Sequence, residues 1–124
     1  MNEYDLIVIG AGSGGLVAAT TANRKGLKTA LIEKHKIGGE CTHFGCVPSK
    51  AFINIAKSYH SLHKMEKFGI SVDIPKIDFS KVMENVDSIV QGIYEHETPD
   101  IFEKQGIDVF VNESGAKFLD SHTS

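Results

Sequence analysis

The sequence predicts an α/β domain in which helices flank a parallel β-sheet. Three observations predict this class: a short apolar run that stops at a glycine cluster, an alanine-rich segment with helical spacing, and a second apolar run that ends in an acidic residue. A strand, a helix and a strand in this order form a unit whose crossover makes the strands parallel. The 124 residues suit one domain or part of one, and 41% apolar content is enough for an ordinary core.

The first strand is expected over residues 4–9, because this β-branched run stops at glycine as a buried parallel strand does. The six residues that follow satisfy the pattern G-x-G-x-x-G. Glycines let the backbone turn tightly and approach a pyrophosphate, whose charge the positive end of the next helix attracts. The candidate phosphate-binding residues are Gly10, Gly12, Ser13, Gly14 and Gly15.

The helix is expected over residues 16–25, with Gly26 as its stop, and a second strand over residues 29–32. That strand leads into Glu33, 18 positions beyond Gly15, where the motif needs an acid. Its carboxylate can accept hydrogen bonds from both hydroxyls of an adenosine ribose and would repel a 2′-phosphate. The order of these parts predicts a Rossmann-like dinucleotide-binding domain. The alternative is a tight turn without a ligand, and the motif alone does not separate FAD from NAD.

The only two cysteines, Cys41 and Cys46, lie in the stretch GGECTHFGCVPSK. In an ideal helix their Cα atoms would be roughly 8.6 Å apart, whereas a disulfide needs less than about 7 Å. A bridge therefore requires a departure from a regular helix, for which Gly45 is permissive. Pro48 fits a first helical turn, so the pair is expected at the start of a helix whose dipole lowers the pKa of a thiol.

Two other interpretations of the pair stay open. Cys41, His43 and Cys46 offer three metal ligands within six residues, with His60 and His63 downstream, but no C-x-x-C is present. We expect His60 and His63 to lie on a solvated helix face. A purely structural disulfide closing so small a loop would add little stability.

The glycine motif, the acid at position 33 and the segment GGECTHFGCVPSK occur in this order, and in this the chain resembles the FAD-dependent pyridine nucleotide-disulfide oxidoreductases. The resemblance runs from Tyr4 to about Phe118 and is sharpest at residues 10–15 and 38–50. It implies that electrons pass from NAD(P)H to FAD, then to a redox-active disulfide, and on to a disulfide or metal-ion substrate. The resemblance also implies that Cys46 faces the flavin and forms a charge-transfer complex, that Cys41 exchanges with substrate, and that Lys50 lies near the hydride-accepting edge.

The resemblance further implies a set of cofactor-binding residues. Besides the glycine motif they are Glu33, Lys34, Gly38, Gly39, Glu40, Cys41, Gly45, Cys46, Lys50 and Ala116. Glu40 departs from the family pattern, because threonine is usual at this position, and its charge would oppose a thiolate at Cys41 unless it is paired or turned to solvent. Ser49 argues against glutathione reductase, which usually carries a second lysine there.

The second half of the chain is expected to add two helices and two strands. A helix over residues 81–96, capped by Asp78 or Ser80, has an apolar stripe that we expect to pack against the sheet. Thr98 and Pro99 begin the next helix, and Gly106 ends it. Strands are expected over residues 107–111 and 116–119.

Charge and composition narrow the class of protein. Thirteen basic and 16 acidic residues leave a net charge of −3 without long runs of one sign, so no nucleic-acid or membrane partner is predicted. We expect a cytoplasmic protein, since residues 6–9, the longest early apolar run, are far too short for a signal peptide or a spanning helix.

The resemblance implies that residues 1–124 are the N-terminal portion of an FAD/NAD(P)-binding domain that is incomplete at its C-terminal end. The NAD(P)H domain, the dimerisation domain and the C-terminal catalytic histidine of the family are absent from these residues. We therefore expect a homodimer for a full-length protein and no turnover by this stretch alone. The alternative function is a non-catalytic nucleotide-binding or redox-sensing module.

Overall fold

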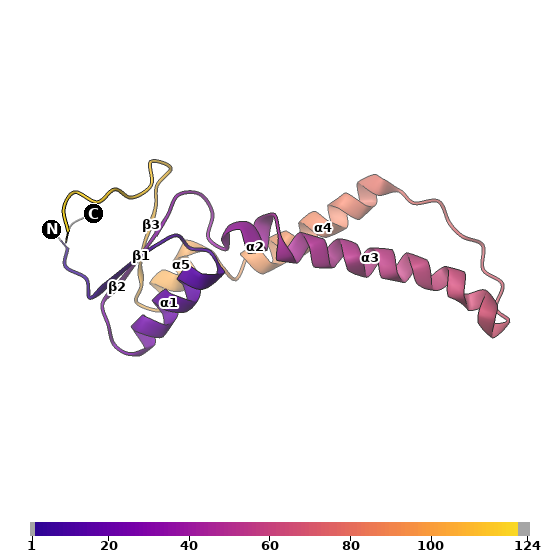
Figure 1. The fold of residues 1–124 in the computed structure, drawn as a ribbon, viewed down its shortest axis with the longest axis horizontal. Coiled ribbons are helices and arrows are strands. Elements are labelled where there is room, and N and C mark those ends of the chain that lie inside the picture. Colours follow the sequence, from indigo (N-terminus) through magenta and orange to yellow (C-terminus); the bar gives the residue numbers. More distant parts are fainter. Residues whose placement is uncertain (1, 122–124) are drawn as a thin grey trace.

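The computed structural model describes residues 2–121, and its centre is a parallel sheet of three strands (Figure 1). The strands are β1 (Leu6–Ile9), β2 (Thr29–Glu33) and β3 (Asp108–Val111), in the order β1-β2-β3. Val8 pairs with Leu31, and Leu31 pairs with Val109, so these three side chains share one face of the sheet. The predicted α/β class with a Rossmann-like parallel sheet is confirmed.

Five α-helices and one 3₁₀ turn complete the described residues. They are α1 (Ser13–Arg24), α2 (Gly39–His43), α3 (Cys46–Lys64), the 3₁₀ turn η1 (Met65–Phe68), α4 (Phe79–Tyr94) and α5 (Pro99–Glu103). Helix α1 begins three residues earlier than predicted, directly after the second glycine of the motif. Gly26 follows its end with a φ of +82°, a conformation that glycine adopts without strain and other residues rarely do.

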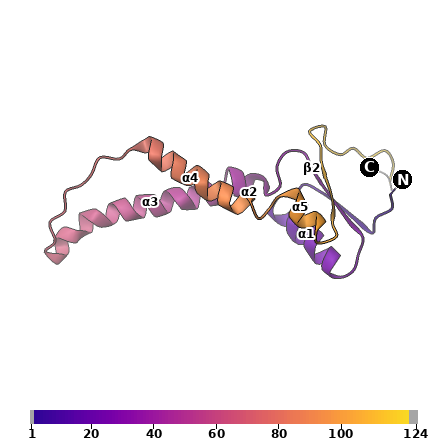
Figure 2. The same cartoon turned by 180° about the vertical axis from the view of Figure 1, so that it is seen from behind.

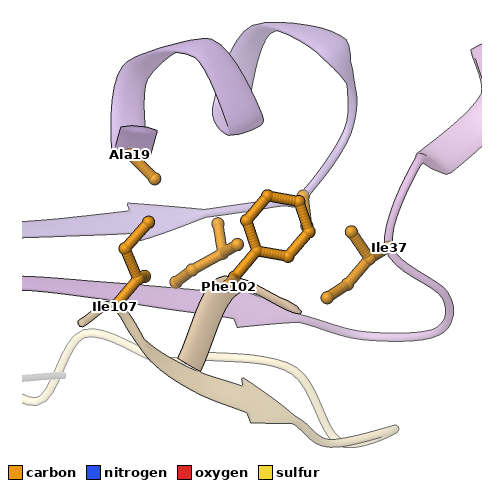
Figure 3. Close-up of a cluster of buried hydrophobic side chains, with 6 residues drawn as sticks. Ala19, Ile37, Phe102 and Ile107 are labelled. Atoms are coloured by element: carbon orange, nitrogen blue, oxygen red, sulfur yellow. The ribbon is translucent and has the colours of Figure 1, made fainter. Parts of the chain in front are cut away.

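The core lies on one face of the sheet, under α1 and α5 (Figure 3). Ala19 comes from α1, Phe102 from α5 and Leu31 from β2, and each is buried. Ile37 and Ile107 close the cluster from the segments after β2 and before β3. Removing such apolar side chains from water stabilises the fold by about 25 cal/mol per Å² of buried surface.

The prediction that the first strand is fully buried is wrong. Side chains of β1 alternate between half-buried and exposed, and Ile9 is 49% exposed. Phe110 of β3 is exposed on the same face, since it is in register with Ile32, which pairs with Ile9. Among residues 2–121 the buried cluster lies on the Val8 face, whereas Ile7, Ile9 and Phe110 on the second face keep contact with solvent.

Helices α3 and α4 lie side by side and project away from the sheet as an arm (Figures 1 and 2). The predicted cap of α4 is confirmed, because the Asp78 carboxylate accepts hydrogen bonds from the backbone N–H groups of Ser80 and Lys81. The expectation that the stripe of α4 packs against the sheet is wrong. Val86 and Val90 are buried where α4 packs on α3 and α2, because α3 supplies a closer apolar partner.

The strand predicted over residues 116–119 is not formed. These residues follow β3 without regular structure, and Phe118 and Leu119 are exposed. An apolar run forms a strand only when a neighbouring strand can accept its hydrogen bonds, and β3 pairs with β2 alone.

Candidate functional site

The loop between β1 and α1 has the shape that the glycine motif predicts. A Cβ atom at Gly15 would collide with the carbonyl oxygen of Gly10, so the third glycine lets α1 pack closely on the strand. Cβ atoms at Gly12 and Gly14 would meet open space instead. The first N–H groups of a helix have no acceptor within the helix, and no side-chain cap satisfies them here. The loop thus leaves N–H groups and open space for an anion.

Glu33, the acid at the end of β2, is bound to that loop. Its Oε2 accepts a hydrogen bond from Ala11 N at 2.6 Å, and its Oε1 accepts one from His35 N at 2.8 Å. Partial burial alone would raise the pKa of Glu33, but the backbone N–H groups of His35, Ala11 and Lys34 hold that pKa below its ordinary value. The carboxylate is therefore ionised at neutral pH, as an acceptor for ribose hydroxyls must be.

The two glycine-rich segments meet in space. Gly38 N donates a hydrogen bond to Ala11 O at 2.8 Å. Gly39 has a φ of +60°, and a Cβ there would lie 3.0 Å from the Cα of Gly12. Only glycine at position 39 permits this approach without strain. The loop with the phosphate-binding pattern and the segment that leads to the cysteines thus form one surface.

A groove of about 780 Å³ opens beside this surface. Glu33, Gly39 and Glu40 line it from the β2 side, and Asp87 and Gln91 line it from α4. A groove of this size is in the range of small-molecule and cofactor sites. Glu40 is exposed and lines the groove, and the effect of its charge on Cys41 stays a prediction.

The two cysteines lie on different helices, which corrects the expectation that both start a single helix. Cys41 is in the five-residue helix α2, whereas Cys46 is the first residue of α3. Phe44 and Gly45 break the helical path between them. Gly45 has an ordinary negative φ, and its role is steric: a Cβ would lie 3.0 Å from Glu40 O and 3.6 Å from the Cα of Cys41.

The two sulfur atoms are neighbours, and both are free thiols in the structure. A side-chain hydrogen bond with Cys46, together with loss of hydration, raises the pKa of the Cys41 thiol above its ordinary value. The positive charge of Lys50 lowers that pKa, though by less. The expected fall in thiol pKa is therefore wrong for Cys41, because in the reduced pair the Cys41 thiol is hydrogen-bonded to Cys46. The redox-active disulfide itself stays a prediction.

The contacts that hold α2 in place were missed by sequence reasoning, which had considered His43 only as a metal ligand. Thr42 Oγ1 donates a hydrogen bond to Glu97 Oε2 at 2.8 Å, across 55 positions of sequence. His43 Nε2 lies 2.9 Å from Ile37 O, and its ring meets the ring of Tyr94 edge-on, with centroids 5.1 Å apart. No local pattern marks such partners, since Tyr94 and Glu97 follow α3 and most of α4 in the chain.

The remaining predicted site residues lie at the edge of this region. Lys34 is exposed and reaches within 3.9 Å of the position of a Cβ at Gly115. Ala116 is half-buried in the segment after β3, and its contact with a cofactor stays a prediction. His60 and His63 are exposed on α3, as expected. Across residues 2–121 no three His, Cys, Asp or Glu side chains are grouped as ligands of one metal ion.

The helices of the described residues include none with the length and apolarity to cross a bilayer. Fold and site together define a Rossmann-like α/β protein with a glycine loop after its first strand and a pair of adjacent thiols. The chain belongs to the pyridine nucleotide-disulphide oxidoreductase family, whose model matches residues 4–122.

Curated relatives agree with this membership. The chain is 41% identical over 91 residues to a dihydrolipoyl dehydrogenase of Bacillus subtilis, and 47% identical over 94 residues to one of Chlamydia trachomatis. These matches cover 73% and 75% of this chain but 19% and 20% of the relatives. A dihydrolipoyl dehydrogenase of Acholeplasma laidlawii is 37% identical over 87% of this chain and 32% of its own length. The chain thus spans about a fifth to a third of these relatives.

Proposed function

We propose that this chain is the FAD-binding, disulfide-bearing part of an oxidoreductase that passes electrons from NAD(P)H through FAD to the pair Cys41 and Cys46. The contact between the two glycine segments carries the proposal. Gly39 lies against Gly12, and Gly38 N donates to Ala11 O. The loop suited to a pyrophosphate therefore touches the segment that leads into the helix of Cys41.

Each part of the surface has a role toward FAD. The N–H groups at the start of α1, from Ser13 and Gly14, would donate to the pyrophosphate. Glu33 would accept hydrogen bonds from the ribose, and Gly38 and Gly39 would let the backbone approach the cofactor. When bound, FAD supplies two-electron transfer between a nicotinamide and a disulfide. Family membership and the dihydrolipoyl dehydrogenase relatives support this cofactor.

The chemistry of the chain's own residues is thiol–disulfide exchange. In the reduced pair, the Cys41 thiolate attacks one sulfur of a substrate disulfide, and the other substrate sulfur leaves and takes up a proton. The Cys46 thiolate then attacks the Cys41 sulfur, which releases the second substrate thiol and restores the Cys41–Cys46 bond. The side-chain hydrogen bond with Cys46 raises the pKa of the Cys41 thiol, and the positive charge of Lys50 opposes this rise, so Lys50 favours the thiolate that attacks.

The substrate is proposed as a disulfide of the lipoyl kind, because the relatives are dihydrolipoyl dehydrogenases. A metal-ion substrate is the alternative; the two thiolates would bind it, and its reduction would not follow the exchange steps above. The exchange steps above require only that the acceptor reach Cys41. A homodimer of the whole protein is part of the same proposal.

Titration of the purified chain with FAD tests the cofactor, with flavin fluorescence as the readout. We expect saturable binding, and about tenfold weaker binding for Glu33→Gln, since hydrogen bonds to a charged acceptor contribute about 1.5–3 kcal/mol. Glu3→Gln is the matched control, because Glu3 is an exposed acid before β1. A folded chain that does not bind FAD contradicts the proposal.

A second measurement separates a redox-active protein from a nucleotide-binding module without redox chemistry. Equilibration of the chain with glutathione disulfide, followed by alkylation and mass analysis, reports whether Cys41 and Cys46 form an intrachain bond. We expect the bond in the parent chain, and none in Cys41→Ser or Cys46→Ser. FAD binding without this bond would favour the module.

A further inference from the structure

We propose that Thr42 and Glu97 are positioning residues that hold Cys41 at bonding distance from Cys46 and thereby set the reduction potential of the pair. The inference rests on the proposed function, because it concerns the redox pair of that function. Its starting point is the length of α2, which has five residues, Gly39–His43. A helix this short does not hold itself in water, so contacts with the rest of the protein must place it.

A hydrogen bond with Glu97 connects that helix to the turn that follows α4. Thr42 is 4% exposed, and its hydroxyl donates to Glu97 Oε2 at 2.8 Å. The same carboxylate oxygen lies against Gly38, where a Cβ would collide with it. Gly38 is also the residue that binds Ala11 O. Glu97 therefore fixes both the N-cap of α2 and the residue next to Cys41.

The contacts of His43 prevent rotation of α2 about its hydrogen bond with Glu97. His43 Nε2 lies 2.9 Å from Ile37 O, and its ring packs edge-on against Tyr94. Ile37 is fully buried in the core, so this contact fixes the position of α2 relative to the sheet. Tyr94 and Glu97 both belong to the end of α4 and the turn after it.

The geometry of the redox pair depends on these ties, because Cys41 and Cys46 belong to different helices. Helix α3 is 19 residues long and carries Cys46 at its start, whereas the position of the five-residue α2 depends on its contacts with the rest of the protein. Oxidation by glutathione disulfide breaks the glutathione S–S bond and forms the Cys41–Cys46 bond. Two electrons and two protons pass to glutathione, which leaves as two thiols. A displaced α2 lowers the effective concentration of one thiol near the other and so disfavours this bond.

Equilibration of the 124-residue chain with glutathione buffers at neutral pH measures this effect. For Thr42→Val and Glu97→Ala we expect the equilibrium constant for the intrachain disulfide to fall about three- to tenfold. A tenfold fall corresponds to about 30 mV for a two-electron couple. Thr42→Ser keeps the hydroxyl and should restore the parent value.

Tyr4→Phe is the matched control, since Tyr4 donates one hydrogen bond to the Asp108 carboxylate at 2.8 Å, at the sheet. We expect it to leave the redox equilibrium unchanged. Urea unfolding of each reduced variant gives the independent reading of stability. If the hydrogen bond between Thr42 and Glu97 only stabilises the fold, its loss would lower the stability of the oxidised and reduced chains alike and leave the equilibrium constant for the disulfide unchanged.

The outcomes are separable. An unchanged equilibrium constant in folded Thr42→Val and Glu97→Ala overturns the inference and leaves the proposed function standing. An equal shift in Thr42→Ser and in Thr42→Val also overturns it, because the hydroxyl would then not be the cause. A parent chain that forms no Cys41–Cys46 bond overturns the proposed function, and the inference falls with it.

Discussion

The sheet with α1 and α5 and the arm of α3 and α4 differ in how they are stabilised. In the sheet region Leu31 and Ile37 have no exposed surface, and they pack with Ala19, Phe102 and Ile107 in one cluster. In the arm only Ala51, Val86 and Val90 of α3 and α4 are buried hydrophobic residues. The sheet region is stabilised by a packed core, whereas α3 and α4 of the arm contact each other along one narrow apolar interface.

The difference shows where each part of the site is placed. The glycine loop after β1 and Glu33 belong to the sheet region, where the buried cluster on one face of the sheet keeps their positions fixed. The cysteines lie where the arm joins the sheet, on a helix pair with fewer buried neighbours. Regions with few buried apolar contacts open locally at lower free energy, which would suit the exchange with a substrate that is proposed for Cys41.

The largest expected effect is on the core of the sheet region. Leu31→Ala should lower the free energy of unfolding by about 2–5 kcal/mol, because it leaves a cavity in the fully buried cluster. Ile53→Ala in the arm is the comparison, and its cost should be below about 0.5 kcal/mol because Ile53 is 52% exposed. Urea unfolding measures both. Equal costs would show that the arm is as well packed as the sheet region.

A smaller effect separates folding from binding within the phosphate loop. Gly15→Ala should cost about 1–3 kcal/mol of stability, because its Cβ would collide with Gly10 O. Gly12→Ala should leave stability unchanged, since its Cβ meets open space, and should weaken FAD binding because that space is needed by the ligand. Unfolding curves and FAD titration report the two properties. Equal FAD affinity in Gly12→Ala and the parent chain would argue against a ligand at this loop.

The smallest effect is at the exposed end of the arm. The hydrogen bond from the Ser80 side chain, with those from backbone N–H groups, lowers the pKa of Asp78. A pKa lowered by folding means that the carboxylate stabilises α4 above its ordinary value near 4 and loses that contribution as pH falls through the folded pKa.

Helicity measured by circular dichroism should therefore decline in acid for the parent chain, while Asp78→Asn, which caps without titrating, should lack this component of the decline. Asp78→Ala should have the reduced helicity already at neutral pH. An identical acid profile in the parent chain and Asp78→Asn would refute the role of this cap.

Much of the fold was predictable because its signals are local. Glycines and apolar periodicity marked β1, α1 and β2 within a few residues, and Asp78 marked the start of α4. The direction in which α4 packs was not predictable, since an apolar stripe is satisfied equally by a sheet or by another helix. The strand expected over residues 116–119 failed for a related reason, because a strand needs a neighbour that the local sequence does not specify.

The sequence alone determined the glycine loop after β1 and the acid at the end of β2, because backbone geometry over a few positions fixes such features. Only the tertiary structure decided that Gly39 rests on Gly12, that the cysteines occupy two helices, and that Glu97 reaches Thr42. These are contacts between segments up to 55 positions apart, and their geometry depends on the packing of the whole core.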